Sequence, residues 1–172
     1  APSLTNSKWT YTTGTIDSAT STVVFAPPNV SGATVVVGSH TLNNILLNPN
    51  SNCSSGCTLT ISSTTTLTAS GTLTFDNSSN HTANLFDINT GAGTASGTIA
   101  ALGNITFGDT NTYAGTATLL INGSGNQTLT GNMTSSTGAT PNFVNINKSV
   151  GTLTLAGTIR YAPDVANSRW IY

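Results

Sequence analysis

The chain has 172 residues, only nine of which are charged, and its formal net charge is −1. Thr, Ser and Asn account for 74 residues, and Glu is absent. Four scattered basic residues cannot form the positive surface of a nucleic-acid-binding protein, and no apolar run approaches the ~18 residues of a membrane-spanning helix. We therefore expect no nucleic-acid partner and no membrane-embedded segment. The low net charge also argues against a disordered tail.

Runs of residues that favour a helix are very short. The longest segment free of Gly, Pro, Ser, Thr, Asn and Asp has four residues, as in Ile99–Leu102. An ordinary helix needs about ten or more residues with apolar positions repeating every 3.6 residues. The sequence therefore predicts a nearly all-β protein.

Six apolar-rich stretches follow one another along the chain, separated by segments rich in Asn, Ser, Gly or Pro: 8–25, 30–48, 57–75, 83–107, 116–133 and 143–161. Within them, polar and apolar residues alternate over short segments, as in Thr58–Ile61, Thr72–Phe75 and Thr152–Leu155. This alternation predicts strands with one buried and one solvated face. Thr suits the solvated face because it is β-branched.

This succession of short strands favours a parallel β-helix, or β-solenoid, of about six coils with about 27 residues each. Inward residues of such coils pack on like residues of the next coil, which requires few charges and few aromatic residues. Only Asn122-Gly123 has the pattern of a tight two-residue hairpin turn, so a meander of hairpins is not favoured. A β-sandwich assembled by strand exchange stays open as the alternative, because short alternating strands occur in both folds.

The two cysteines, Cys53 and Cys57, lie in the segment Cys-Ser-Ser-Gly-Cys. Three intervening residues do not match a redox CxxC motif, and neither histidine is at ligand spacing for zinc. We predict a disulfide that holds a turn, with two free thiols as the alternative, and no metal or cofactor. A disulfide together with few lysines favours a secreted protein at an extracellular or cell-surface location.

Nine Asn-x-Ser/Thr sequons are candidates for glycosylation: Asn29, Asn52, Asn77, Asn80, Asn104, Asn122, Asn126, Asn132 and Asn147. A chain this rich in Asn, Ser and Thr contains about six sequons by chance. Composition alone accounts for most of them, and glycosylation remains the alternative.

No group of side chains predicts catalysis. Asp76 and Asp87 are candidates for the carboxylate pair of a polysaccharide-cleaving β-helix, but no further acid or Arg lies near them in the sequence. Asp109 begins a segment with too few ligands for calcium, and His81 lies in a polar, loop-like segment. Lys148 could form an isopeptide bond only beside a buried acid. We therefore expect a protein that is not an enzyme.

Thr-x-Thr segments begin near residues 58, 66, 72, 116, 128 and 152. On a solenoid they would place Thr on one exposed face, as in ice-binding solenoids. Their uneven spacing and the unequal coils argue against a flat, regular grid. An ice- or carbohydrate-binding module is kept as the alternative function.

The two ends of the chain repeat each other. Residues 6–11 read Asn-Ser-Lys-Trp-Thr-Tyr and residues 167–172 read Asn-Ser-Arg-Trp-Ile-Tyr, a match that includes both tryptophans of the chain. This indicates a long-period repeat, with 1–166 as one solenoid unit and 167–172 as the first strand of the next repeat or the junction between subunits. We expect copies to join end to end through Lys8, Trp9, Tyr11, Arg169, Trp170 and Tyr172.

Four segments resemble tandem repeats of large secreted bacterial surface proteins, the filamentous-haemagglutinin-like and autotransporter-like adhesins: Trp9–Asp17, Ser21–Phe25, Thr118–Gly131 and Ile146–Ile159. The resemblance implies a right-handed parallel β-helix and a structural role in an extracellular filament or adhesin stalk. It brings no catalytic or ligand residue to this chain. Pro27-Pro28 and the cysteine segment depart from it.

Overall fold

The computed structural model describes residues 6–26, 33–48, 57–75, 86–88, 97–108, 115–133, 140–162 and 166–172. Within these ranges the chain forms short strands and no helix, as predicted. None of the described elements is a helix long and apolar enough to cross a membrane.

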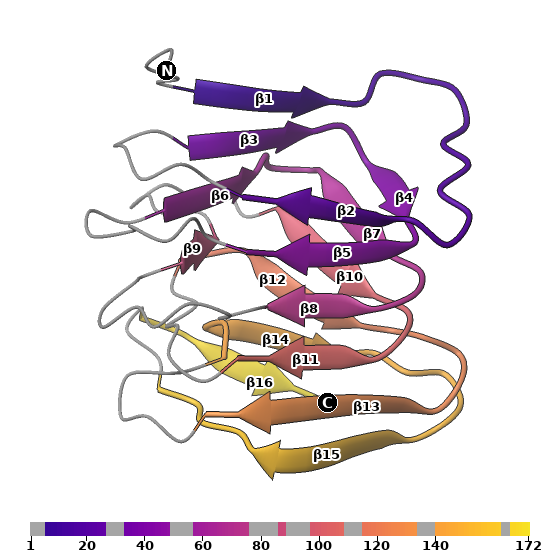
Figure 1. The fold of residues 1–172 in the computed structure, drawn as a ribbon. Coiled ribbons are helices and arrows are strands. Elements are labelled where there is room, and N and C mark those ends of the chain that lie inside the picture. Colours follow the sequence, from indigo (N-terminus) through magenta and orange to yellow (C-terminus); the bar gives the residue numbers. More distant parts are fainter. Residues whose placement is uncertain are drawn as a thin grey trace.

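The strands form three sheets that run along one stack (Figure 1). Sheet A has four strands, in the order β1 (Asn6–Thr10), β3 (Ala33–Val37), β6 (Cys57–Ile61) and β9 (Phe86–Ile88). Sheet B has six, in the order β2 (Thr22–Phe25), β5 (Asn44–Leu47), β8 (Leu73–Phe75), β11 (Ile105–Phe107), β13 (Gln127–Asn132) and β15 (Leu153–Thr158). Sheet C also has six, in the order β4 (His40–Leu42), β7 (Thr66–Ala69), β10 (Thr98–Ala101), β12 (Thr118–Ile121), β14 (Phe143–Ile146) and β16 (Arg169–Ile171).

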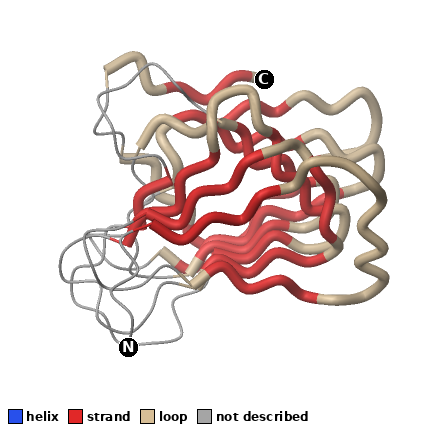
Figure 2. Tube along the Cα trace, turned by 90° about the horizontal axis from the view of Figure 1, so that it is seen from above, coloured by secondary structure: helices blue, strands red, loops and turns tan. Residues whose placement is uncertain are grey.

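Every pairing between the described strands is parallel. Consecutive strands of the chain lie in different sheets, and from β4 on the chain returns to sheets B and C in every coil, so that strands of successive coils overlie one another in Figure 2. The predicted β-solenoid is confirmed. The β-sandwich alternative is wrong, because a sandwich is built from antiparallel sheets.

The coils differ in length, but their strands stay in register. In sheet C, Thr66 pairs with Thr98, 32 residues later, and Thr98 pairs with Thr118, only 20 residues later. The difference therefore lies between the strands and leaves the hydrogen-bonded ladders intact.

Inward-facing residues of successive coils form the core. In β7 and β12, buried and half-buried residues alternate along the strand, as expected for one inward and one outward face. In sheet B, Phe75 and Phe107 are in register and fully buried, and their rings stack with centroids 4.5 Å apart. Each fully buried side chain of this size contributes about 1.5–3 kcal/mol to the stability of the fold. A continuous apolar column therefore holds the coils together.

Candidate assembly interfaces

Several residues singled out in the sequence lie outside the described residues, namely Cys53, Asp76, His81, Asp109, Asn29, Asn52, Asn77 and Asn80. Only the backbone is described for Cys57 in β6 and Asp87 in β9. The disulfide and the glycosylation of all nine predicted sequons stay predictions. In the part of the chain that is described, no three His, Cys, Asp or Glu residues come together as a metal site.

The N-terminal end of the solenoid carries a cluster of aromatic rings. The indole Nε1–H of Trp9 in β1 donates to Nε2 of His40 in β4, at 2.9 Å. His40 Nδ1 lies 2.7 Å from the carbonyl oxygen of Gly38, so the imidazole donates there and accepts from Trp9. The Trp9 and Tyr11 rings both stack on His40, with centroid distances of 6.1 and 5.3 Å. Tyr11 and Trp9 are thus held by one buried histidine.

A shallow groove lies beside this cluster at the same end. It has a volume of about 320 Å³ and runs between the outermost strands β1 and β2. Trp9 packs edge-on against Phe25 across the groove, at 5.7 Å, and yet remains 38% exposed. Val24 on β2 is 50% exposed. The N-terminal end therefore presents uncovered apolar surface.

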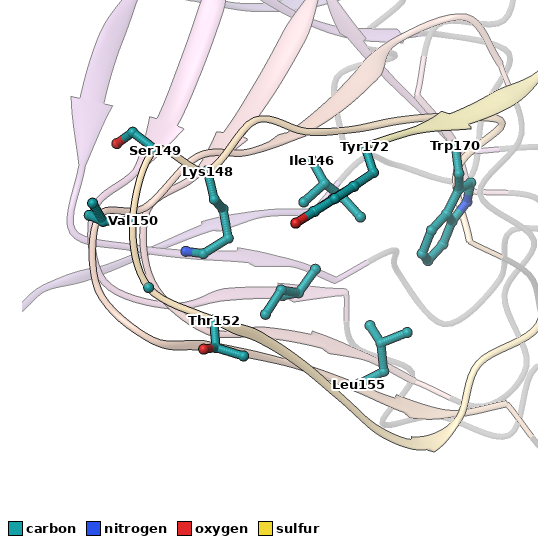
Figure 3. A pocket seen from close by; sticks show the side chains of 10 residues that line it. Ile146, Lys148, Ser149, Val150, Thr152, Leu155, Trp170 and Tyr172 are labelled. Carbon is teal, nitrogen blue, oxygen red and sulfur yellow. The ribbon is translucent and has the colours of Figure 1, made fainter.

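The C-terminal end has a larger pocket of about 550 Å³ (Figure 3). It is lined by the turn between β14 and β15, by β15, and by the rings of Trp170 and Tyr172. Leu155 is 55% exposed, and Tyr172 is fully exposed. This end is therefore also apolar and open.

Trp170 and Trp9 occupy equivalent positions of the matching hexapeptides but differ in the partner of the indole nitrogen. Trp170 packs against the hydrophobic core and meets Tyr161 edge-on at 6.0 Å. Its Nε1 is buried and has no hydrogen-bond partner, whereas that of Trp9 is bonded to His40. A buried N–H without an acceptor is costly, so the C-terminal end lacks one polar contact that the N-terminal end has.

The structure brings the six predicted junction residues together as two groups at opposite ends of the stack (Figure 1). Lys8 and Arg169 are both exposed at their ends. Whether the two groups meet between copies stays a prediction.

Lys148 occupies a site that the sequence reasoning missed. Its Nζ lies 2.5 Å from the carbonyl oxygen of Gly123, 2.9 Å from that of Gly125, and 2.7 Å from Gln127 Oε1. Gln127 is buried, and its amide donates to the carbonyl oxygens of Ala101 and Gly103. The ammonium group thus joins successive coils through neutral oxygens. A carboxylate beside it, as an isopeptide bond requires, is not among these contacts.

Three asparagines at the corner before sheet B bond to the next coil. The side-chain oxygens of Asn44, Asn104 and Asn126 accept the backbone N–H groups of Thr72, Thr128 and Thr152, at 2.8, 2.9 and 3.0 Å. Two of these asparagines were predicted as sequons. Their position in the fold gives them a structural role, which composition alone could not reveal.

Threonines on the outer face of sheet B are in register. Thr74, Thr106 and Thr130 occupy successive strands, between Leu46 at one end and Ala156 at the other. A second column, on sheet C, consists of Thr66, Thr98 and Thr118. The coils are of unequal length, but the extra residues lie between the strands and leave these threonines in register.

Comparisons with family models, with curated proteins and with solved structures found no match to this chain.

Proposed function

We propose that this chain is a structural, non-enzymatic repeat unit of an extracellular filament or adhesin stalk, and that its copies stack end to end. The observation that supports the proposal best is the pair of apolar ends. In the described part of the chain, β1 and β2 are the outermost strands at one end and β15 and β16 at the other, and each has a sheet neighbour on one side only. Such edges offer unpaired N–H and C=O groups to another chain.

Proteins that stay monomeric usually protect such edges with charge, Pro or bulges. Lys8 and Arg169 are the charged residues in these four strands. With a net charge of −1, repulsion between copies is small. The exposed side chains of Val24 and Leu155 favour burial against another surface.

The extracellular location is part of the proposal. It is supported by the two closely spaced cysteines, by the scarcity of lysine, and by the resemblance to secreted surface repeats.

Sedimentation velocity and electron microscopy of the purified chain test the proposal. We expect larger, elongated species to form as the protein concentration rises. Leu155→Asp places a charge on the C-terminal end and should shift the chain toward monomer. Leu102→Asp is the matched control, because Leu102 is also exposed but lies at a corner between β10 and β11. A wild-type chain that stays monomeric at millimolar concentration contradicts the proposal.

The aligned threonine columns favour a second candidate, an ice- or carbohydrate-binding face. Thr106→Tyr in the middle of the sheet B column should then abolish inhibition of ice recrystallisation or retention on a polysaccharide, whereas Thr10→Tyr on β1 should not. If the wild-type chain has neither activity, this candidate is rejected.

A further inference from the structure

We propose that β16 of one copy replaces β1 of the next copy, lying between its own β14 and β3 of that second copy. The inference rests on the proposed end-to-end stacking and specifies its geometry. Sheet C of one copy would then continue as sheet A of the next.

The first argument is the register of the two matching hexapeptides. In β1, Trp9 pairs with Val36 of β3, and in β16, Trp170 pairs with Val144 of β14. Both valines are buried, so both tryptophans stand over the inward-facing column of a sheet. With β16 in the place of β1, that column would read Val144, Trp170 and then Val36 of the second copy.

The second argument is strand direction and free edges. β16 runs parallel to β14, and β1 runs parallel to β3, so one strand can satisfy both neighbours without reversing. β1 has a single sheet neighbour, β3, and β16 has a single neighbour, β14. A shared strand would have two neighbours, and its ladder with β3 would replace the β1–β3 ladder that the exchange breaks. Exchange of like elements between copies therefore costs little.

The third argument is the unpartnered indole N–H of Trp170. In the position of β1, Trp170 would face His40 of the second copy as Trp9 faces its own His40. His40 Nε2 is an acceptor in that arrangement, because its Nδ1 already donates to Gly38. The second copy thus supplies the acceptor that the C-terminal end lacks.

The outward side chains agree with the exchange. Lys8 and Arg169 occupy equivalent positions, and both are exposed. Arg169 would replace Lys8 opposite Val35 of the second copy, with the same charge at the same place.

Cysteine cross-linking between differently labelled chains tests this geometry, in a C53S/C57S background whose circular dichroism matches the wild type. An R169C chain mixed with a V35C chain should give a disulfide-linked dimer as the main product. If R169C instead links mainly to a K8C chain, β16 of one copy lies beside β1 of the next, and β1 has not been displaced. The strand exchange is then wrong, while the proposed end-to-end stacking stands. If neither pair links, both are rejected.

A double-mutant cycle in a W9F background tests the same geometry with the natural cysteines retained, because His40 otherwise accepts from Trp9 in the free copy. W170F keeps an aromatic ring but removes the N–H, and H40F removes the acceptor. Each change should weaken association by about tenfold, as loss of one hydrogen bond does. If the two groups bond across the junction, the double variant should be no weaker than either single variant. Independent effects, giving about a hundredfold loss, would overturn the exchange.

Discussion

At the scale of single residues, the corners of the coils leave the least space for a side chain. A Cβ on Gly103 would lie 1.8 Å from the backbone oxygen of Gly71 in the preceding coil. A Cβ on Gly125 would meet nothing within 4 Å. The same residue type is therefore required at one corner for close packing of the backbone, while at another it is only tolerated.

We expect Gly103→Ala to lower the free energy of unfolding by about 1–3 kcal/mol, because backbone rather than a movable side chain occupies the space. Gly125→Ala is the matched control and should be neutral or stabilise by about 0.4–1 kcal/mol, through a less flexible unfolded chain. Urea denaturation of both variants measures the difference. Equal effects at the two positions would contradict the close approach.

The half-buried ammonium group of Lys148 is the other decisive feature at this scale. Lys148→Met keeps most of the side-chain volume but removes the three hydrogen bonds to neutral oxygens. We expect a loss of about 1–3 kcal/mol in the free energy of unfolding. Lys8→Met, at an exposed position, should change it by less than about 0.5 kcal/mol. Thermal denaturation of the two variants measures the difference. A Lys148→Met variant as stable as the wild type would show that these contacts do not contribute to the stability of the fold.

At the scale of elements, asparagine side chains bind the starts of β8, β13 and β15 in sheet B to the coil before each of them. The backbone ladder ends at the corner, and the asparagine oxygens of Asn44, Asn104 and Asn126 extend it by one hydrogen bond per coil. These bonds fix where each strand of sheet B begins, although the chain between strands varies in length.

We expect Asn126→Ala to destabilise the fold by about 1 kcal/mol, because the N–H of Thr152 loses its protein acceptor. Hydrogen–deuterium exchange at Thr152 should become faster in this variant. Asn147→Ala is the control, since Asn147 is an exposed asparagine and also lies in a sequon. Unchanged exchange at Thr152 in Asn126→Ala would refute the role of the side chain.

At the scale of the whole molecule, the fold is a stack with one direction and two different open ends. Every inner coil buries its inward side chains against a coil on each side. The outermost coils have a neighbour on one side only, and the pockets at Trp9 and at Trp170 lie on their open sides. The forces available at these ends are apolar burial and backbone pairing.

Association of copies should therefore depend little on salt. Between about 50 and 500 mM NaCl we expect the association constant to change by less than about threefold, because few charges at the ends can be screened. Sedimentation equilibrium at several salt concentrations measures this. A steep fall with salt would mean that Lys8 and Arg169 bind the copies through opposite charges elsewhere on the surface.

The sequence alone determined the class of fold and the places of most strands. Alternation of polar and apolar residues is a local property, so segments such as Thr72–Phe75 showed which side chains face inward. The absence of helix-forming runs removed the main competing structure. The hexapeptide match marked both ends of the chain, because the two tryptophans stand out against a composition dominated by Thr, Ser and Asn.

Only the tertiary structure decided which residues meet between coils. Trp9 and His40 are 31 residues apart, and Lys148 and Gln127 are 21 residues apart. Such pairs depend on the register between strands, which the connections of unequal length conceal in the sequence. Local periodicity fixes the side of the strand on which a residue lies, but its partner is set by how far the chain travels before it returns to the same sheet.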